Sequence, residues 1–314
     1  MNGARSATTS GVFQHEGLVY RTPNEYLAGT VPFVRAGLDA GEPVLVAVPG
    51  TNGELLRAAL GAASAQVRFI DMAQAGRNPG RIIPAVLHAF VGQHAPARVR
   101  VIGEPIWAGR SAVEYPACVQ HEALINLAFA DDDAIILCPY DAARLAPAVL
   151  ADAESTHPIM GVGEERWPSN GYVEPQSVVS AFNRPLPQPP APPATLIFDA
   201  DELPAVRRFV TRHASRAGLS ATRVGDLEVA VNEVATNAVV HGGGPGTVRI
   251  WPERGSVICE VSDSGYLRDP LAGRIPPGLD SEHGRGLLLV NYLCDLVRMY
   301  THRAGTTMHL HMRV

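Results

Sequence analysis

Residues 227–241 read LEVAVNEVATNAVVH, and their pattern indicates how the second half of the chain folds. Its apolar residues recur at helical spacing from Leu227 to Ala238, which predicts a helix with one buried face. Glu233 and Asn237 lie one turn apart and therefore project from the same side of this helix, beside the apolar stripe. Asparagine is a poor helix-interior residue, so a role for its side chain is expected, and its oxygen suits a hard Mg²⁺ ion. The alternative is a solvated Glu–Asn pair with no role in a site.

A strand and a tight turn follow in VICEVSDSG, residues 257–265. The strand is expected to end at Asp263, and Gly265 permits a turn with positive φ. A carboxylate at a strand end can accept a hydrogen bond from an exocyclic amine, such as that of adenine. A plain Asx turn is the alternative for this tripeptide.

Two further glycine-containing segments complete the pattern. Gly284 and Gly286 open an apolar helix in HGRGLLLV, residues 283–290, and backbone amides at a helix start favour phosphate oxygens. An ordinary helix start is the alternative, since GxG alone is a weak signal. Near the chain end, a Gly-Thr-Thr turn at residues 305–307 leads into the last strand, where a hydroxyl can reach a bound base.

The order and spacing of these motifs resemble the ATP site of the GHKL, or Bergerat-fold, superfamily. The helix matches the N-box, DSG the first glycine box and GRG the second. Within the superfamily, NEVATNAVVHG and GRGLLLVNYLCDLV are similar to the motifs of the anti-sigma-factor serine kinases. The resemblance covers residues 195–314 and implies an α+β Bergerat-fold ATPase sandwich that binds ATP and Mg²⁺.

The resemblance also implies a role for each matching residue. Glu233 matches the general base, and Asn237 matches the Mg²⁺ ligand. The nucleotide-binding residues that it implies are Asp263 and Gly265 at the adenine, Gly284, Arg285 and Gly286 in the phosphate-covering lid, and Thr306 or Thr307 near the adenine. The lid segment, residues 267–282, is short and rich in proline.

Composition narrows the function classes. The chain has 314 residues, enough for about two domains, and its net charge of -5 argues against direct binding to nucleic acid or anionic lipid. All 26 basic residues are arginine, which excludes a P-loop lysine and Schiff-base chemistry. The 4 cysteines form no CxxC pair, and we find neither a signal peptide nor a membrane-spanning run. We therefore expect a cytoplasmic protein without membrane contact.

Proline divides the chain. Residues 183–195 read NRPLPQPPAPPAT and predict an extended linker between a domain at 12–165 and a second at 196–314. Before the linker, strands expected at 43–49, 67–72, 98–105 and 134–141 alternate with helices expected at 24–40, 80–94 and 115–130, which indicates a parallel α/β sheet. Residues 161–169 are predicted to be a loop. After the linker, two helices precede four strands, as in an α+β layer.

The first domain resembles the MEDS sensory domain of bacterial regulators, which implies a RecA- or KaiC-like α/β fold. The matching stretches include GLVYRTPNEYLAGTVPFVRAGLDAGEPVLVAVP, RVRVIGEPIW, HEALINLAFA and ILCPYDA. No GKT follows the strand before Gly50, so nucleotide hydrolysis is not expected here. Polar residues near the predicted strand ends line either a small-molecule pocket or a satisfied core; they are Glu104, Trp107, His121, Glu122, Cys138, Tyr140 and Asp141.

Three functions fit this organisation. The first is a regulator of the anti-sigma-factor type, a serine/threonine kinase that acts on an antagonist protein under control of the sensory domain. Its expected partners are a sigma factor, the antagonist, or both, and a homodimer is possible. The second is an ATP-dependent switch that sequesters a partner without phosphoryl transfer. The third, a sensor histidine kinase, is disfavoured because a proline linker stands where that class needs a dimerising helical hairpin.

Two other features invite a functional interpretation. His309 and His311 share a strand face but have no third metal ligand in view, so we expect a solvated sheet face. Four arginines at 207, 208, 212 and 216 give one helix a basic face, which is either solvated or directed to an acidic partner.

Overall fold

The computed structural model describes residues 12–276 and 284–314, which form two compact units. Unit 1 comprises Met1–Gln74, Val86–Arg110 and Ile125–Pro175, and unit 2 comprises Ala75–Ala85, Ser111–Leu124 and Gln176–Val314. Within the described ranges, no helix combines the length and apolar character that crossing a membrane requires.

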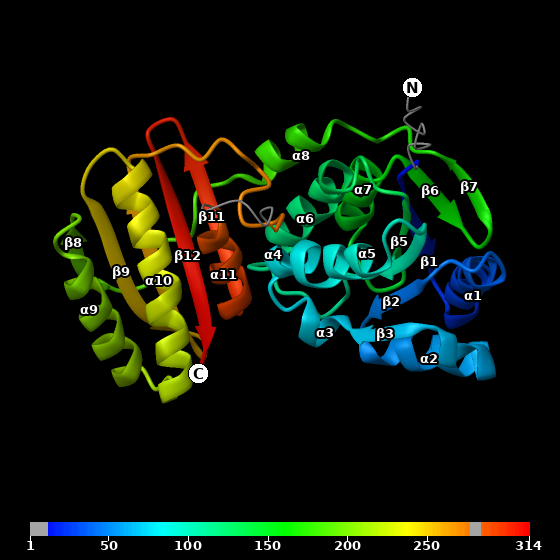
Figure 1. Cartoon of the computed structure of the whole chain (residues 1–314), viewed down its shortest axis with the longest axis horizontal. Helices are drawn as coiled ribbons and strands as arrows, with labels where there is room; N and C mark the ends of the chain where they lie inside the picture. Colours follow the sequence, from blue (N-terminus) through cyan, green and yellow to red (C-terminus); the bar gives the residue numbers. More distant parts are fainter. Residues whose placement is uncertain (1–11, 277–283) are drawn as a thin grey trace, which may run out of the picture. The chain divides into compact units, whose positions relative to one another are not determined.

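Unit 1 is built on a seven-stranded sheet in the order β3-β2-β4-β5-β1-β6-β7 (Figure 1). The strands are β1 (Gln14–Tyr20), β2 (Val44–Val48), β3 (Arg68–Asp71), β4 (Val99–Gly103), β5 (Ala134–Asp141), β6 (Ile159–Val162) and β7 (Glu165–Pro168). All pairs are parallel except β6 with β7. β2 and β5 are buried along nearly their whole length, as expected for central strands of a parallel sheet with helices on its faces.

The helices of unit 1 connect these parallel strands. They are α1 (Pro23–Asp39), α2 (Gly50–Leu60), α5 (Ala89–His94) and α7 (Pro147–Thr156), while α3 (Met72–Ala75) and α6 (Tyr115–Ala128) run from one unit into the other. The start of α1 is fixed by Thr22, whose hydroxyl accepts from the Glu25 amide at 3.2 Å, and by Pro23 at the first helical position. The α/β class predicted for this half of the chain is confirmed.

The helix expected at 80–94 is present as a continuous helical run, composed of α4 (Pro79–Ile82), a π-helical stretch (Ile83–His88) and α5. The π-helical stretch contains Pro84, which has no amide hydrogen and whose ring crowds the preceding turn. One local prediction for this half is wrong. The loop expected at 161–169 instead contains parts of β6 and β7, an antiparallel hairpin that continues the sheet beyond β1.

Unit 2 contains a five-stranded antiparallel sheet in the order β11-β12-β10-β9-β8. The strands are β8 (Ala194–Phe198), β9 (Gly246–Glu253), β10 (Ser256–Asp263), β11 (Leu296–His302) and β12 (Gly305–Arg313). The helices α9 (Leu203–Arg216), α10 (Ala221–His241) and α11 (Arg285–Leu293) form a layer against it (Figure 1). The buried stripe of α10 includes Leu227, Val231 and Val234, which confirms the predicted amphipathic helix and the α+β class.

The proline-rich segment has neither helix nor strand from residue 183 to residue 193. Helix α8 (Pro175–Phe182) precedes it, and β8 already begins at Ala194. Its first residue is anchored in unit 2, because the Asn183 side chain donates to the Thr301 carbonyl at 2.6 Å and accepts from the Thr301 amide at 3.1 Å. The segment is thus held to unit 2 at its first residue.

Candidate nucleotide site

A cavity of about 630 Å³ lies in unit 2, a size typical of small-molecule and cofactor sites. Its walls come from the C-terminal half of α10, the end of β10 and the segment after it, the start of α11, and β12. Among the residues singled out in the sequence, those that line it are Asn237, Asp263, Gly265, Gly284, Gly286 and Thr306. Four motifs that are far apart in the sequence therefore meet at one cavity.

Asp263 ends β10 and forms the Asx turn that the sequence offered as an alternative. Its Oδ1 accepts from the Gly265 amide at 2.6 Å. Partial burial raises the pKa of the Asp263 carboxyl, and the hydrogen bond from Gly265 opposes this effect without cancelling it. A carboxylate accepts at both oxygens, so the turn is compatible with a ligand that donates to Asp263.

A pair of hydroxyls fixes the segment after Asp263. Thr306 Oγ1 donates to the Gly265 carbonyl at 2.8 Å, so the Thr301 hydroxyl is the donor in the 2.8 Å bond between the two threonines. The Thr301 oxygen in turn accepts from the Leu267 amide at 3.1 Å. Successive side chains of a strand face opposite sides, and of the two threonines predicted near the base it is Thr306, not Thr307, that faces the cavity.

Glycine allows the end of α10 to approach this turn closely. A Cβ on Gly265 would lie 2.8 Å from the His241 carbonyl oxygen and 2.9 Å from the Gly242 Cα. On Gly242, a Cβ would lie 2.9 Å from the Asp263 Cβ. Larger residues at either position would push the carboxylate-bearing turn away from the helix that carries Asn237.

Glu233 lies against the first turn of α11 rather than in the cavity wall. Gly284 precedes that helix with a φ of 93°, and a Cβ on Gly286 would lie 2.7 Å from Glu233 Oε2. Arg285 is exposed and does not line the cavity. Glu233 and Asn237 project from one side of α10, as predicted, with Asn237 at the cavity and Glu233 beside its glycine-containing rim.

The predicted lid is described only in part, since residues 277–283 lie outside the described residues. The described part contacts α11 through a hydrogen bond and close packing. Asn291 Nδ2 donates to the Gly273 carbonyl at 3.0 Å, and Gly273 adopts a φ of 70° so close to Leu287 that a Cβ would lie 2.6 Å from the Leu287 Cβ. The α11 helix and the segment containing Gly273 therefore form one wall of the cavity.

Asn78, at the N-cap of α4, supports this wall through hydrogen bonds to Asn291. Its side-chain nitrogen donates to the Asn291 carbonyl at 2.9 Å and to the Asn291 side-chain oxygen at 3.2 Å. Its side-chain oxygen accepts from the Gly80 amide at 3.1 Å. A Cβ on Gly80 would lie 2.1 Å from the Asn291 side-chain oxygen, so only glycine fits there without a shift of Asn291.

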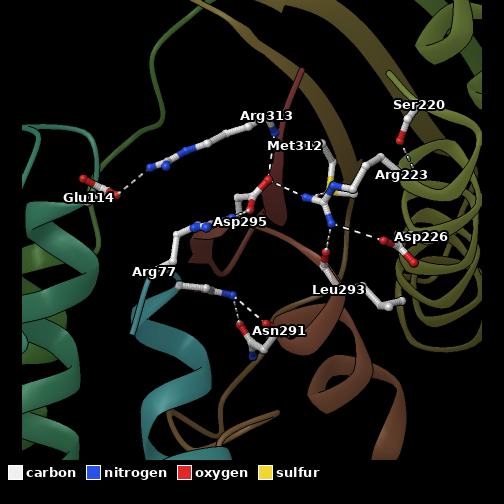
Figure 2. A network of polar contacts seen from close by, with 11 residues as sticks. Arg77, Glu114, Ser220, Arg223, Asp226, Asn291, Leu293, Asp295, Met312 and Arg313 are labelled. Atoms are coloured by element: carbon white, nitrogen blue, oxygen red, sulfur yellow. Dashed lines mark hydrogen bonds and ion pairs between the residues drawn. The ribbon is translucent and has the colours of Figure 1, made fainter. Parts of the chain in front are cut away.

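A charged network adjoins these asparagines at the end of α11 (Figure 2). Asp295 accepts from Arg77 at 2.7 Å, from the Arg313 amide at 2.8 Å, and from Arg223 on α10. Burial would raise the pKa of the Asp295 carboxyl, but the Arg313 amide and the two guanidinium groups outweigh burial and lower it. The carboxylate thus joins α10, β12 and the segment before α4.

Sequence reasoning did not single out this supporting set. Asn291 could have been identified from the sequence, because it is an asparagine inside the apolar helix GLLLVNYL, as Asn237 is inside α10. Asn78 and Asp295 carry no comparable signal, since their roles depend on partners distant in the sequence.

The candidate pocket residues of the first domain are mostly buried. Glu104, at the end of β4, is 2% exposed, and it accepts from Asn52 Nδ2 at 2.7 Å, while Asn52 also donates to the Tyr20 hydroxyl at 3.2 Å. Burial raises the pKa of Glu104 to about 8, although hydrogen bonding to Asn52 and Tyr20 lowers it. Tyr140 and Cys138 lie inside β5, and His121 and Glu122 are buried on α6. Trp107 stacks on the Arg110 guanidinium at 3.9 Å.

The solvated sheet face predicted for His309 and His311 is wrong for His309, while His311 is half-buried. His309 is 2% exposed, and its Nε2 lies 2.8 Å from Glu260, which also binds Arg249. Burial of the sheet face around Trp251 and Glu260 explains the difference. The basic face predicted on α9 is present, with the arginines at 208, 212 and 216 exposed.

Comparisons with known proteins find two family matches along the chain. The family model of the MEDS domain (methanogen/methylotroph, DcmR sensory domain) matches residues 14–158, and that of the histidine kinase-like ATPase domain matches residues 197–314. A comparison with curated proteins finds no match. Among solved structures, the chain is similar to the RsbU and RsbW domains of Rv1364c from Mycobacterium tuberculosis, with 22% identity and a TM-score of 0.30. That match covers 39% of this chain and 33% of the other.

Proposed function

Because the chain carries a MEDS domain followed by a histidine kinase-like ATPase domain, we propose that it is an ATP-binding regulator of the anti-sigma-factor type. In this proposal it transfers a phosphoryl group from ATP to a serine or threonine of an antagonist protein, and the sensory domain controls the reaction. Its partners are the antagonist, a sigma factor, or both. The observation that carries the proposal is the convergence of Asn237, Asp263 and the Gly284–Gly286 turn on one cavity.

The cavity offers chemistry suited to each part of ATP. The Asp263 carboxylate accepts from the adenine amine, in a pocket with apolar walls from Val234, Leu271 and Met308. The start of α11 presents backbone amides to phosphate oxygens. These donors replace the lysine that a P-loop would use, which the sequence lacks.

The carboxamide of Asn237 suits the hard cation that accompanies ATP. Its oxygen is the type of ligand that Mg²⁺ takes alongside water and substrate phosphates. When bound, Mg²⁺ neutralises charge that develops on the transferred phosphoryl group. Asn237 lines the cavity one helical turn from Glu233, so residues suited to the metal and to the proton lie on the same side of α10.

Glu233 is proposed as the general base. It removes the proton from the acceptor hydroxyl as the hydroxyl oxygen forms a bond to the γ-phosphorus, and the bond to the β,γ-bridging oxygen breaks so that ADP leaves with that electron pair. Its place at the rim of the cavity, beside Gly286, suits a base that meets a protein substrate from outside.

Hydrogen bonds within unit 2 could transmit control by the first domain to the cavity. Residues 75–85 fall inside the stretch matched by the MEDS model, yet they pack with the ATPase domain in one compact unit. Asn78 from this stretch holds Asn291, and Asn291 holds the cavity wall at Gly273. A signal that shifts α4 would therefore reach the nucleotide site.

The proposal is tested by transfer of radiolabel from ATP to candidate antagonist proteins. Glu233→Ala should keep ATP affinity within a small factor but lower transfer about 10²-fold or more, because the base contacts the hydroxyl and not the nucleotide. Asn237→Ala should weaken both ATP binding and transfer.

The chemistry of the labelled product separates the alternatives. Acid-stable label that depends on Glu233 supports serine or threonine transfer. ATP-dependent partner binding without any transfer would favour the sequestering switch. Acid-labile label on the chain itself would favour a histidine kinase.

A further inference from the structure

Three buried side chains of unit 1 converge at a place that the proposed ATP chemistry does not use. They are His15 on β1, Cys138 on β5 and His157 just before β6, and each is at most 1% exposed. Each offers one ligand atom, and these atoms all lie within 4.8 Å of one another. We propose that this cluster, named here the His–Cys–His cluster, is a binding site for a divalent transition metal of the zinc class.

The sheet brings the three residues together. β1 lies between β5 and β6, and Gly17 is in register with Cys138 on one side and with Met160 on the other. His15 lies two residues before Gly17 and therefore shares its face of the sheet. Gly17 also leaves room for the third member, since a Cβ there would lie 3.3 Å from His157 Cγ and 2.6 Å from Met160 Sδ.

Hydrogen bonds fix the tautomer of His15. Asn126 Nδ2 donates to the Thr156 carbonyl at 2.8 Å, and because a carbonyl only accepts, this contact determines which side-chain atom of Asn126 is nitrogen. Asn126 Oδ1 then faces His15 Nδ1 at 3.2 Å, so Nδ1 must carry the hydrogen. The lone pair of His15 is therefore on Nε2, the atom that lies 3.4 Å from Cys138 Sγ.

His157 is oriented in the same way. Its Nδ1 lies 2.8 Å from the Ala153 carbonyl and must donate to it, which leaves the lone pair on Nε2. The rings of His15 and His157 lie with their centroids 4.1 Å apart. A histidine that donates one ring nitrogen to a carbonyl or amide oxygen and offers the other as a base is the arrangement that surrounds most metal-bound histidines.

The distances and ligand types favour the zinc class. With metal–sulfur bonds of about 2.3 Å and metal–nitrogen bonds of about 2.0–2.1 Å, the ligand atoms of a tetrahedral site lie about 3.3–3.6 Å apart. The distance of 3.4 Å between His15 Nε2 and Cys138 Sγ falls in this range. Two imidazoles and one thiolate suit Zn²⁺ and similar borderline-soft ions, whereas Mg²⁺ and Ca²⁺ prefer oxygen.

Metal binding also accounts for Cys138 better than packing alone. A buried thiol elsewhere behaves as a small apolar side chain, as Cys259 does in the core of unit 2. Cys138 instead meets the basic nitrogen of an oriented imidazole. On binding, its sulfur gives up a proton to solvent and forms a bond to the metal, so about one proton should be released per metal bound.

The test uses Co²⁺ as the probe on the untagged full-length chain after treatment with a chelator. The account predicts one Co²⁺ per chain with a thiolate-to-cobalt absorption band, and displacement of the band by Zn²⁺. Cys138→Ala should abolish the band, and His157→Gln should weaken binding more than about 100-fold. Asn126→Ala removes only the orienting partner of His15 and should weaken binding about 10- to 100-fold.

The matched control is Cys259→Ala, which removes a buried thiol from the other unit and should leave the band and the affinity unchanged. If Cys138→Ala does not fold, alkylation of the wild-type chain replaces it: Zn²⁺ should protect Cys138 from an alkylating reagent, as read by peptide mapping, and should not protect Cys259. Absence of stoichiometric Co²⁺ binding by the wild-type chain would overturn the proposal. A cobalt band that survives in folded Cys138→Ala, or a lack of protection by Zn²⁺, would do the same.

Discussion

Asn78 holds Asn291 through two hydrogen bonds, one of 2.9 Å to its backbone carbonyl and one of 3.2 Å to its side-chain oxygen. The side chain of Asn291 then donates to the Gly273 carbonyl at 3.0 Å. Two asparagines therefore connect α4, in the stretch matched by the sensory family, to the wall of the cavity in the ATPase domain.

Asn78→Ala is expected to loosen this wall. The substitution leaves buried groups on Asn291 without their donor, which should lower the stability of unit 2 by about 1–3 kcal/mol. Affinity for ATP should fall about tenfold, because the wall must then be ordered on binding. Calorimetric titration and denaturant unfolding measure both effects. Asn232→Ala is the control, since Asn232 accepts from Arg207 and does not line the cavity. Equal ATP affinity in the two variants would show that Asn78 does not support ATP binding.

Gly286 is expected to be intolerant of any side chain. A Cβ would lie 2.7 Å from Glu233 Oε2, so Gly286→Ala must displace either the proposed base or the first turn of α11. We expect phosphoryl transfer to fall at least about tenfold, by analogy with other displaced catalytic groups. Gly225→Ala provides the contrast within α10, because nothing lies within 4 Å of its Cβ and alanine should stabilise the helix by about 0.5–1 kcal/mol. Full transfer activity in Gly286→Ala would show that the close approach of Gly286 to Glu233 is not needed for transfer.

Glu104 predicts a dependence of stability on pH. Burial raises its pKa in the folded chain to about 8 from an ordinary 4.5, so between these values the folded state holds a proton that the unfolded state has lost. The free energy of unfolding of unit 1 should therefore fall as pH rises from about 4.5 to about 8, by on the order of a few kcal/mol. Glu104→Gln resembles the protonated acid and should match the wild type near pH 5. At pH 8 the variant should be the more stable of the two in denaturant titrations, and a wild type that is equally stable at both pH values would refute this assignment.

The sequence predicts several residues that line the cavity of unit 2, because they belong to local motifs. Asn237 is recognisable as a polar residue inside an apolar helix, and Asp263 ends a strand beside a glycine. Four such segments occur in the order that the GHKL resemblance implies, and the structure brings six of the nine residues singled out there to one cavity.

What could not be predicted depends on partners distant in the sequence. The segment at 161–169 is weak in β-formers, and it becomes a hairpin only because β1 offers a pairing edge to β6. His309 belongs to an alternating strand pattern, but Glu260 and Arg249 on neighbouring strands give it a buried environment. In the His–Cys–His cluster, His15 and His157 lie 142 positions apart in the sequence, and no spacing rule links them.

We expect the cavity of unit 2 to bind Mg-ATP through Asp263, and calorimetric titration of the full chain with Mg-ATP measures this binding. The account predicts one site per chain that requires Mg²⁺ and that Asp263→Asn weakens at least about tenfold, because an amide cannot reproduce the charge-assisted acceptance of the carboxylate. Asp269→Asn, which removes a negative charge from the same cavity, controls for charge and should bind at least as tightly as the wild type. Absence of binding, or equal affinity in Asp263→Asn and the wild type, would contradict the claim.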